Sequence, residues 1–250
     1  MERVRAAVDV VQSPRSKVQS PLDEVHGPQS TVHSPRSADE SSGFRAQEER
    51  AGEAERSVVS GQWSAVSSLG AGAELYVDAN GAYARKEALE MGERFAEFGV
   101  SWFEEPVSSD DLEWLRMIRE RAPACMQVAA GEYGYDAVYF RRMLEAGAVD
   151  VLQADATRCA GITGFMQAGA LCEAFMTPLS AHTAPSIHLH PCCALGRAIN
   201  VEYFYDHYRI EQMFFEGAAW PVEGVLRPDL SRTGLGLEFK RKQAAKYEVK

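Results

Sequence analysis

Six short apolar runs in this chain each end in an acidic or imidazole side chain. These six side chains are Asp78, Glu104, Glu132, Asp155, His182 and Glu202. Between the runs, apolar residues recur three and four positions apart, which is the spacing of an amphipathic helix. Examples are Ala88, Met91, Phe95 and Phe98; Leu112, Leu115 and Ile118; and Ala137, Phe140 and Leu144. Short apolar strands that alternate with helices are typical of a parallel sheet whose outer face is covered.

The spacing of the runs matches the βα units of a barrel, in which successive strand ends open onto one face. We therefore predict an α/β fold: a partial (β/α) TIM-type barrel of about six βα units whose polar strand ends converge. The expected helix ends agree with this fold. Gly99 and Gly147 stand where two helices should stop, and residues 108–111 (SSDD) offer caps and acids for the start of another.

The first part of the chain differs in composition. Residues 12–61 are rich in Ser, Pro, Arg, Gln and Glu, and they repeat V-Q/H-S-P loosely at Val11, Val18 and Val32. Such a segment buries too little apolar area to offset its ordering entropy. We expect residues 1–71 to be a low-complexity, mostly disordered N-terminal segment, with a possible barrel-helix remnant at 1–11. Residues 58–69 could form one helix or strand, and residues 72–250 form the barrel domain.

Composition excludes several classes of function. The chain of 250 residues is 46% hydrophobic and has a formal charge of −10, which disfavours binding to nucleic acid or to anionic membranes. No apolar run approaches the roughly 18 residues of a membrane span, and the start lacks the apolar core of a signal peptide, so we expect a cytoplasmic protein. Five cysteines without a C-x-x-C pair fit neither a disulfide framework nor a zinc site.

Three carboxylates at consecutive strand ends suit a divalent cation. Asp78, Glu104 and Glu132 offer hard oxygen ligands, which Mg²⁺ prefers, and without a cation they would repel one another. The alternative is that each acid caps the next helix or faces solvent. Glu105 is the weaker candidate beside Glu104, because neighbours on a strand point to opposite faces.

Asp155 and His182 end the next two strands. A carboxylate beside a histidine fixes its tautomer and raises its basicity, as a general base acting on a carbon acid requires. We assign His188 and His190, which lie off the strand end, to structural roles. Glu202 could hydrogen bond to a substrate carboxylate or a developing enolate oxygen; the alternative is an ordinary acid at the rim.

Several sequence motifs coincide with the predicted strands and the segments that follow them, over about residues 74–249. They are VDANGAY (77–83), WFEEP (102–106), AGE (130–132), LQADATRCAGITG (152–164), SAH (180–182), RPD (227–229) and GLGL (234–237). Together they resemble the enolase superfamily, in its mandelate racemase and muconate lactonizing enzyme branch. The resemblance implies a modified barrel, Mg²⁺ held by the three carboxylates named above, a dyad of Asp155 and His182, and Glu202 and Asn80 near the substrate. The implied chemistry is abstraction of the proton α to the carboxylate of a small molecule, an acid-sugar or 2-hydroxy acid, giving a metal-stabilised enediolate.

The chain also departs from that family. Members of that family have an N-terminal capping domain and two first barrel strands, one of which carries Lys-x-Lys, and these parts have no counterpart here. Lys17, the only lysine before Lys86, lies in the polar tract. Ala160 stands where a second glycine is usual. The chain thus resembles a truncated, interrupted gene product.

Three hypotheses follow for the function. An acid-sugar dehydratase-like enzyme comes first, because one histidine can both take the α-proton and assist departure of the β-hydroxyl. A racemase-like enzyme comes second, because it needs bases on both faces of the α-carbon. The third is a catalytically silent truncated remnant, whose open sheet edges would also favour a homo-oligomer.

Overall fold

The structure, a computed structural model, describes residues 5–8 and 74–249. Its main sheet is parallel, with the strand order β1-β7-β6-β5-β4-β3-β2. The strands are β1 (Arg5–Val8), β2 (Leu75–Asp78), β3 (Val100–Glu104), β4 (Gln127–Ala130), β5 (Val151–Ala154), β6 (Leu179–Ala181) and β7 (Ala198–Tyr203). The helices that follow β2 to β7 are α2 (Arg85–Ala96), α3 (Leu112–Arg121), α4 (Ala137–Glu145), α5 (Gly161–Ala174), α6 (Pro185–Ala194) and α7 (Tyr205–Phe214).

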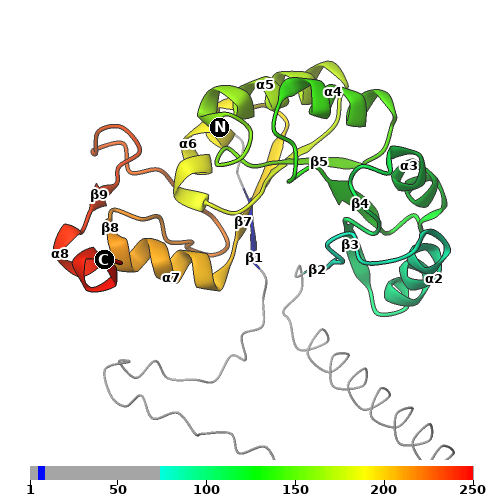
Figure 1. The fold of residues 1–250 in the computed structure, drawn as a ribbon, viewed down its shortest axis with the longest axis horizontal. Helices are drawn as coiled ribbons and strands as arrows, with labels where there is room; N and C mark the ends of the chain where they lie inside the picture. Colours follow the sequence, from blue (N-terminus) through cyan, green and yellow to red (C-terminus); the bar gives the residue numbers. More distant parts are fainter. Residues whose placement is uncertain (1–4, 9–73, 250) are drawn as a thin grey trace, which may run out of the picture. The chain divides into compact units, whose positions relative to one another are not determined.

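These elements form an open arc of strands with helices along its outer side (Figure 1). Six βα units in chain order confirm the predicted partial barrel. After α7, the short strands β8 (Phe215–Glu216) and β9 (Glu238–Phe239) pair antiparallel, and α8 (Arg241–Ala244) and a 3-10 turn (Ala245–Tyr247) complete the described chain. No helix in residues 74–249 is long and apolar enough to cross a membrane.

The N-terminal expectations are mostly outside the described residues, including the low-complexity tract and the segment 58–69. The exception is residues 5–8, where we expected the remnant of a helix. They form β1 instead, which pairs with β7 and places Ala7 opposite Glu202. The expectation of open sheet edges was therefore wrong at β7. A free strand edge presents unpaired N–H and C=O groups, which a short extended segment satisfies better than an isolated helical turn does. No described strand pairs with the outer edge of β2.

The start of α3 and the ends of α2 and α4 lie where the sequence predicts them. The Asp111 and Asp136 side chains accept hydrogen bonds from the backbone N–H groups at the starts of α3 and α4. Gly99 and Gly147 lie just after α2 and α4 with φ of +76° and +62°, a conformation that only glycine adopts without strain.

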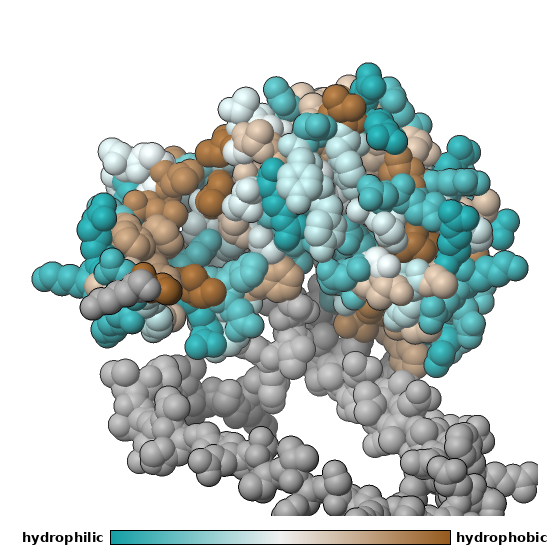
Figure 2. All heavy atoms as spheres, viewed as in Figure 1, coloured by the Kyte–Doolittle hydropathy of each residue, from teal (hydrophilic) through white to brown (hydrophobic). Residues whose placement is uncertain are grey.

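The largest core cluster lies between the strands and their helices. Leu115, Ile118, Phe140 and Leu144 are buried there, as their helical spacing predicts. A smaller cluster groups Trp102 with Ala129, Val151 and Tyr76. The Tyr76 and Trp102 rings stack with centroids 4.9 Å apart. Polar side chains cover much of the face in Figure 2, and apolar ones gather over the C-terminal elements, where Trp220 and Phe239 are exposed.

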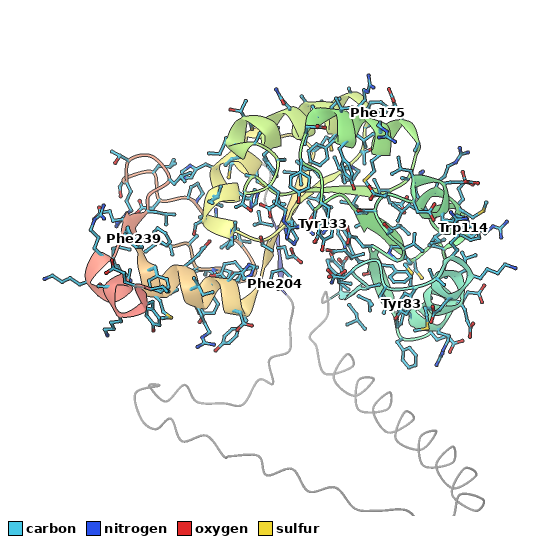
Figure 3. All side chains as sticks on the ribbon, in the orientation of Figure 1. Tyr83, Trp114, Tyr133, Phe175, Phe204 and Phe239 are labelled. Atoms are coloured by element: carbon cyan, nitrogen blue, oxygen red, sulfur yellow. The ribbon has the colours of Figure 1, made fainter. Side chains whose placement is uncertain are left out.

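Phe103 supports a test of this packing. It is 0% exposed and its ring meets those of Phe95 and Tyr83 edge-on, whereas Phe175, on the outer side of the arc, is 39% exposed (Figure 3). We expect Phe103→Ala to lower the free energy of unfolding by about 3–5 kcal/mol and Phe175→Ala by about 1 kcal/mol or less in urea titrations. Equal losses would contradict the assigned core.

Candidate active site

The ends of β2 and β3 bring two carboxylates side by side. The register of the two strands pairs Asp78 with Glu104. Glu104 is 5% exposed, and its Oε2 accepts a hydrogen bond of 3.0 Å from the indole N–H of Trp102, which lies two residues earlier on the same strand. Asp78 accepts hydrogen bonds from the backbone and side-chain amides of Asn80. The other oxygen of Glu104, Oε1, has no hydrogen-bond partner among the described residues.

Glu132 reaches the site because Gly131 allows the chain to turn after β4. The φ of Gly131 is +131°, and a Cβ there would lie 2.3 Å from the carbonyl oxygen of Gln153. A side chain at Gly131 is thus excluded by contact with β5. The Oε2 of Glu132 lies 2.9 Å from Nε2 of His182, and its Oε1 lies 3.1 Å from the Arg158 guanidinium. Glu132 therefore contacts two cationic groups.

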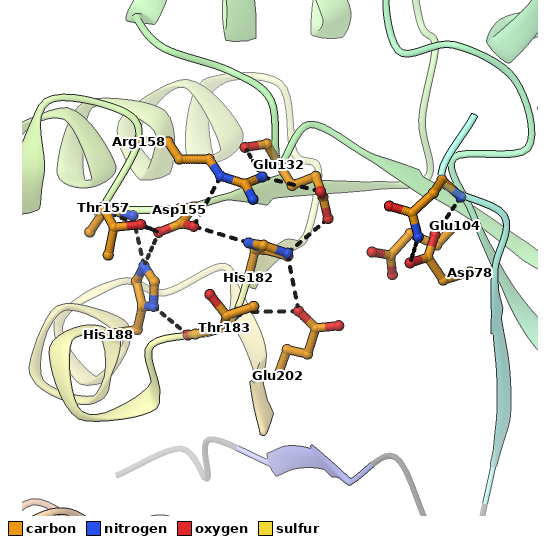
Figure 4. A network of polar contacts seen from close by, with 12 residues as sticks. Asp78, Glu104, Glu132, Asp155, Thr157, Arg158, His182, Thr183, His188 and Glu202 are labelled. Atoms are coloured by element: carbon orange, nitrogen blue, oxygen red, sulfur yellow. Dashed lines mark hydrogen bonds and ion pairs between the residues drawn. The ribbon is translucent and has the colours of Figure 1, made fainter. Parts of the chain in front are cut away.

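His182 lies at the centre of the polar network (Figure 4). Its Nδ1 lies 3.0 Å from Oδ2 of Asp155, and its Nε2 lies 3.7 Å from Oε2 of Glu202 in addition to the Glu132 contact. Asp155 is held in turn, because its Oδ1 accepts hydrogen bonds from the N–H and the hydroxyl of Thr157 at 2.7 and 2.8 Å. The dyad predicted from the sequence has this geometry.

The turn after His182 is strained. Thr183 and Ala184 have φ of +48° and +38°, in the left-handed region. For residues with a side chain, such a conformation costs on the order of 1–3 kcal/mol each and persists only where the surroundings enforce it. One enforcing contact is the hydrogen bond of 3.1 Å that the Thr183 N–H donates to Glu202.

The predicted site residues thus fall into two groups in this structure. His182 joins Asp155, Glu132 and Glu202 in one network, and Asp78 lies with Glu104 in a second group that faces it in Figure 4. Within the described residues, no three His, Cys, Asp or Glu side chains are placed to bind one metal ion. The assignment of the three carboxylates as Mg²⁺ ligands therefore remains a prediction.

The electrostatics nevertheless fit a cation. Burial, followed by the charge of Asp78, raises the pKa of Glu104 to about 7. Burial, followed by the charge of Glu104, raises the pKa of Glu202 to about 8. The charges of these carboxylates repel one another, and one buried oxygen of Glu104 has no hydrogen-bond partner among the described residues. A hard divalent ion prefers such a set of oxygen ligands.

The pKa of His182 is also raised, but here the shift favours the charged form of the group. Burial alone would lower the pKa of the ring, but hydrogen bonds to Asp155 and Glu132 outweigh burial and raise the pKa to about 10. The partner carboxylate responds accordingly: burial opposes ionisation of Asp155, yet its hydrogen bonds to His182 and Thr157 lower its pKa to about 2. In the absence of a competing cation, the His182 ring is therefore an imidazolium between two carboxylates at neutral pH.

Sequence reasoning missed two residues of this region. Arg158, three positions after Asp155, was visible as a lone cation among acids, and its guanidinium also stacks over the Tyr133 ring at 5.0 Å. Glu105 was expected to point away from the site. Its φ of +39° breaks the strand alternation, its side chain is buried, and burial together with the charge of Glu132 raises its pKa to about 8.

The raised pKa of His182 predicts a pH-dependent stability in the metal-free chain. The charged ring stabilises the fold fully below its ordinary pKa of 6.5, and this contribution is lost as pH rises through about 10. We expect the unfolding free energy of the wild type to exceed that of His182→Gln near neutral pH, and the difference to shrink towards about pH 10 in urea titrations. A constant difference would contradict the assigned ion pairs.

Comparisons with known proteins show the family to which the chain belongs. The family model described as "Enolase C-terminal domain-like" matches residues 39–244, beginning within the segment assigned to low complexity. D-galactarolactone cycloisomerase from Agrobacterium fabrum is 34% identical over 200 residues, which are 72% of this chain and 50% of that protein. The chain spans about half the length of the first curated relatives that it matches.

Solved structures share the fold. A mandelate racemase/muconate lactonizing enzyme-like protein from Rubrobacter xylanophilus is 46% identical, with a TM-score of 0.71 over 76% of this chain and 53% of that one. The L-talarate dehydratase from Polaromonas sp. JS666, complexed with Mg and L-glucarate, is 29% identical, with a TM-score of 0.64 over 71% of this chain and 48% of that one.

Proposed function

The chain belongs to the enolase C-terminal domain-like family, and we propose that its site removes the proton α to the carboxylate of a sugar acid. The observation that carries this proposal is the geometry of His182. Asp155 binds its Nδ1, and its Nε2 faces Glu132 and Glu202 at the strand ends. A histidine whose tautomer is fixed by a carboxylate is suited to general-base catalysis.

The base must first lose its proton. In the described structure, Nε2 of His182 shares its proton with Oε2 of Glu132 at 2.9 Å, so the ring is occupied as a donor. Nε2 accepts a substrate proton only after it has released this proton to solvent and Glu132 has turned to another partner. Asp155 then continues to hold Nδ1, which keeps the lone pair of Nε2 directed towards the substrate position.

We propose Asp78, Glu104 and Glu132 as the ligands of a Mg²⁺ ion. The unpartnered oxygen of Glu104 and the mutual repulsion of these acids support the assignment. When bound, such an ion supplies Lewis-acid stabilisation of the negative charge that develops on the substrate carboxylate. Arg158 also lies 3.6 Å from Asp155, so it would keep an acidic partner beside the site when Glu132 binds the ion.

Two further side chains have proposed substrate roles. Burial, followed by the charge of Glu104, raises the pKa of Glu202 to about 8, so this carboxyl group is protonated at neutral pH and can donate a hydrogen bond to a substrate oxygen. Asn80 lies beside Asp78, and its amide is the proposed contact to a substrate hydroxyl.

Dehydration is the reaction that a single base favours. The α C–H bond breaks as Nε2 of His182 takes the proton, and the electron pair forms a double bond to Cβ. This double bond forms as the Cβ–O bond breaks, and the β-hydroxyl leaves as water with the proton that Nε2 returns to it. A racemase needs a second base on the other face of the α-carbon, whereas the geometry here supports one base, His182. Several other curated relatives are named dehydratases of sugar acids, which supports this choice.

A second candidate is a domain without catalytic activity. Two observations favour it: no described strand pairs with the outer edge of β2, and Glu132 is engaged by His182 and Arg158 rather than grouped with Asp78. Such a domain would fold and would leave sugar acids unchanged.

Isotope exchange separates the two candidates. Given Mg²⁺ and a panel of sugar acids in D₂O, we expect slow deuterium incorporation at the α-carbon, measured by NMR, because a base and carboxylate ligands are both present. His182→Gln should reduce the rate about 100-fold or more, as expected for loss of a general base.

His190→Gln is the matched control, because His190 lies on α6 outside the polar network, and it should keep the wild-type rate. Absence of exchange in a folded, Mg²⁺-loaded wild type would favour the domain without activity. Exchange that His182→Gln leaves unchanged would show that His182 is not the base.

A further inference from the structure

His188 is a second buried histidine next to the dyad. It lies in the first half of α6 and is 0% exposed. Its ring packs against that of Phe165 on α5, with centroids 4.8 Å apart. A ring enclosed in this way does not contact a substrate, so any role in the reaction acts through other residues.

Both ring nitrogens of His188 make hydrogen bonds with the backbone. Nε2 lies 2.8 Å from the N–H of Ala156, and Nδ1 lies 2.8 Å from the carbonyl oxygen of Thr183. A backbone N–H can only donate and a carbonyl can only accept, so Nδ1 carries the proton and Nε2 is the acceptor. The contacts therefore determine a single neutral tautomer.

These two hydrogen bonds join the loops that carry the dyad. Ala156 directly follows Asp155, and Thr183 directly follows His182. The ring of His188 thus bridges the ends of β5 and β6 just beyond the hydrogen bond of 3.0 Å between Asp155 and His182 (Figure 4). We propose that His188 is a positioning residue that holds Asp155 and His182 in register, an inference that rests on the proposed function of this dyad.

The strained turn explains why such a bridge is needed. Thr183 and Ala184 have positive φ values, and a turn of this kind relaxes unless its backbone is held. Both backbone polar groups of Thr183 are hydrogen-bonded: its carbonyl oxygen accepts from His188, and its N–H donates to Glu202. Relaxation of the turn would move His182, and a displacement of about 1 Å at a catalytic group can cost about 100-fold in rate.

The tautomer can be tested in the unmodified full chain. Long-range ¹H–¹⁵N NMR of the histidine rings should show His188 as neutral and protonated at Nδ1. A His188 ring protonated at Nε2, or at both nitrogens near neutral pH, would contradict the assigned hydrogen bonds and overturn the proposal.

The positioning role is tested with variants of matched packing. His188→Phe keeps an aromatic ring against Phe165 but removes both hydrogen bonds, and His188→Asn keeps a donor for the Thr183 carbonyl. Phe165→Leu is the control, because it disturbs the same packing and leaves both bonds intact. The readout is exchange with water of the Nδ1 proton that His182 shares with Asp155, measured without substrate.

We expect His188→Phe to speed this exchange about 10-fold or more, because it removes two hydrogen bonds and each contributes up to about a factor of 10, with a smaller effect for His188→Asn. Phe165→Leu should leave the exchange rate near that of the wild type. Equal effects of His188→Phe and Phe165→Leu, or no effect of His188→Phe, would overturn the proposal.

The same variants separate this inference from the proposed function. If the wild type exchanges the α-proton of a sugar acid, His188→Phe should lower kcat and leave KM nearly unchanged. If the wild type shows no such activity, the proposed function fails, while the NMR measurement still decides whether His188 positions His182.

Discussion

The contact of His182 with two carboxylates is the interaction on which the site depends. Asp155 binds one ring nitrogen and Glu132 binds the other, each at about 3 Å. The parallel sheet creates this arrangement, because every strand delivers its terminal side chain to the same inner region. The positive charge of the His182 ring offsets the repulsion between Asp155 and Glu132. The protonation of His182 and the conformation of Glu132 are therefore linked.

The backbone at these strand ends adopts conformations that are rare elsewhere. Gly131 turns where any side chain would meet β5, Glu105 has a positive φ, and Thr183 and Ala184 form a left-handed turn. Gly131, Glu105 and Thr183 are each adjacent in sequence to a residue of the site, and Ala184 lies two positions after His182. The surrounding sheet and helices provide the packing that stabilises this strain, which is why the polar groups can be held in positions that unstrained loops would not give.

The periodic parts of the fold could be predicted from the sequence. Apolar runs and helical stripes identify strands and helices locally, and the barrel rule then places Asp155 and His182 at one face. Features that depend on distant partners could not be predicted. The residues of β1 carry no strong strand signal and become a strand because β7 offers a free edge, while Glu105 depends on one backbone dihedral. The role of His188 depends on backbone atoms 32 and 5 residues away.

The link between Glu132 and His182 gives the most direct test of the central claim. Mg²⁺ titrated by calorimetry in buffers of different ionisation enthalpy reports how many protons binding releases. At about pH 9, Glu104 and Glu202 are mostly ionised, and His182 still carries a proton held by Glu132. If Glu132 turns to the metal, wild-type binding should release a proton and His182→Gln should not. Mg²⁺ binding without proton release, or equal release in both proteins, would contradict the proposed site.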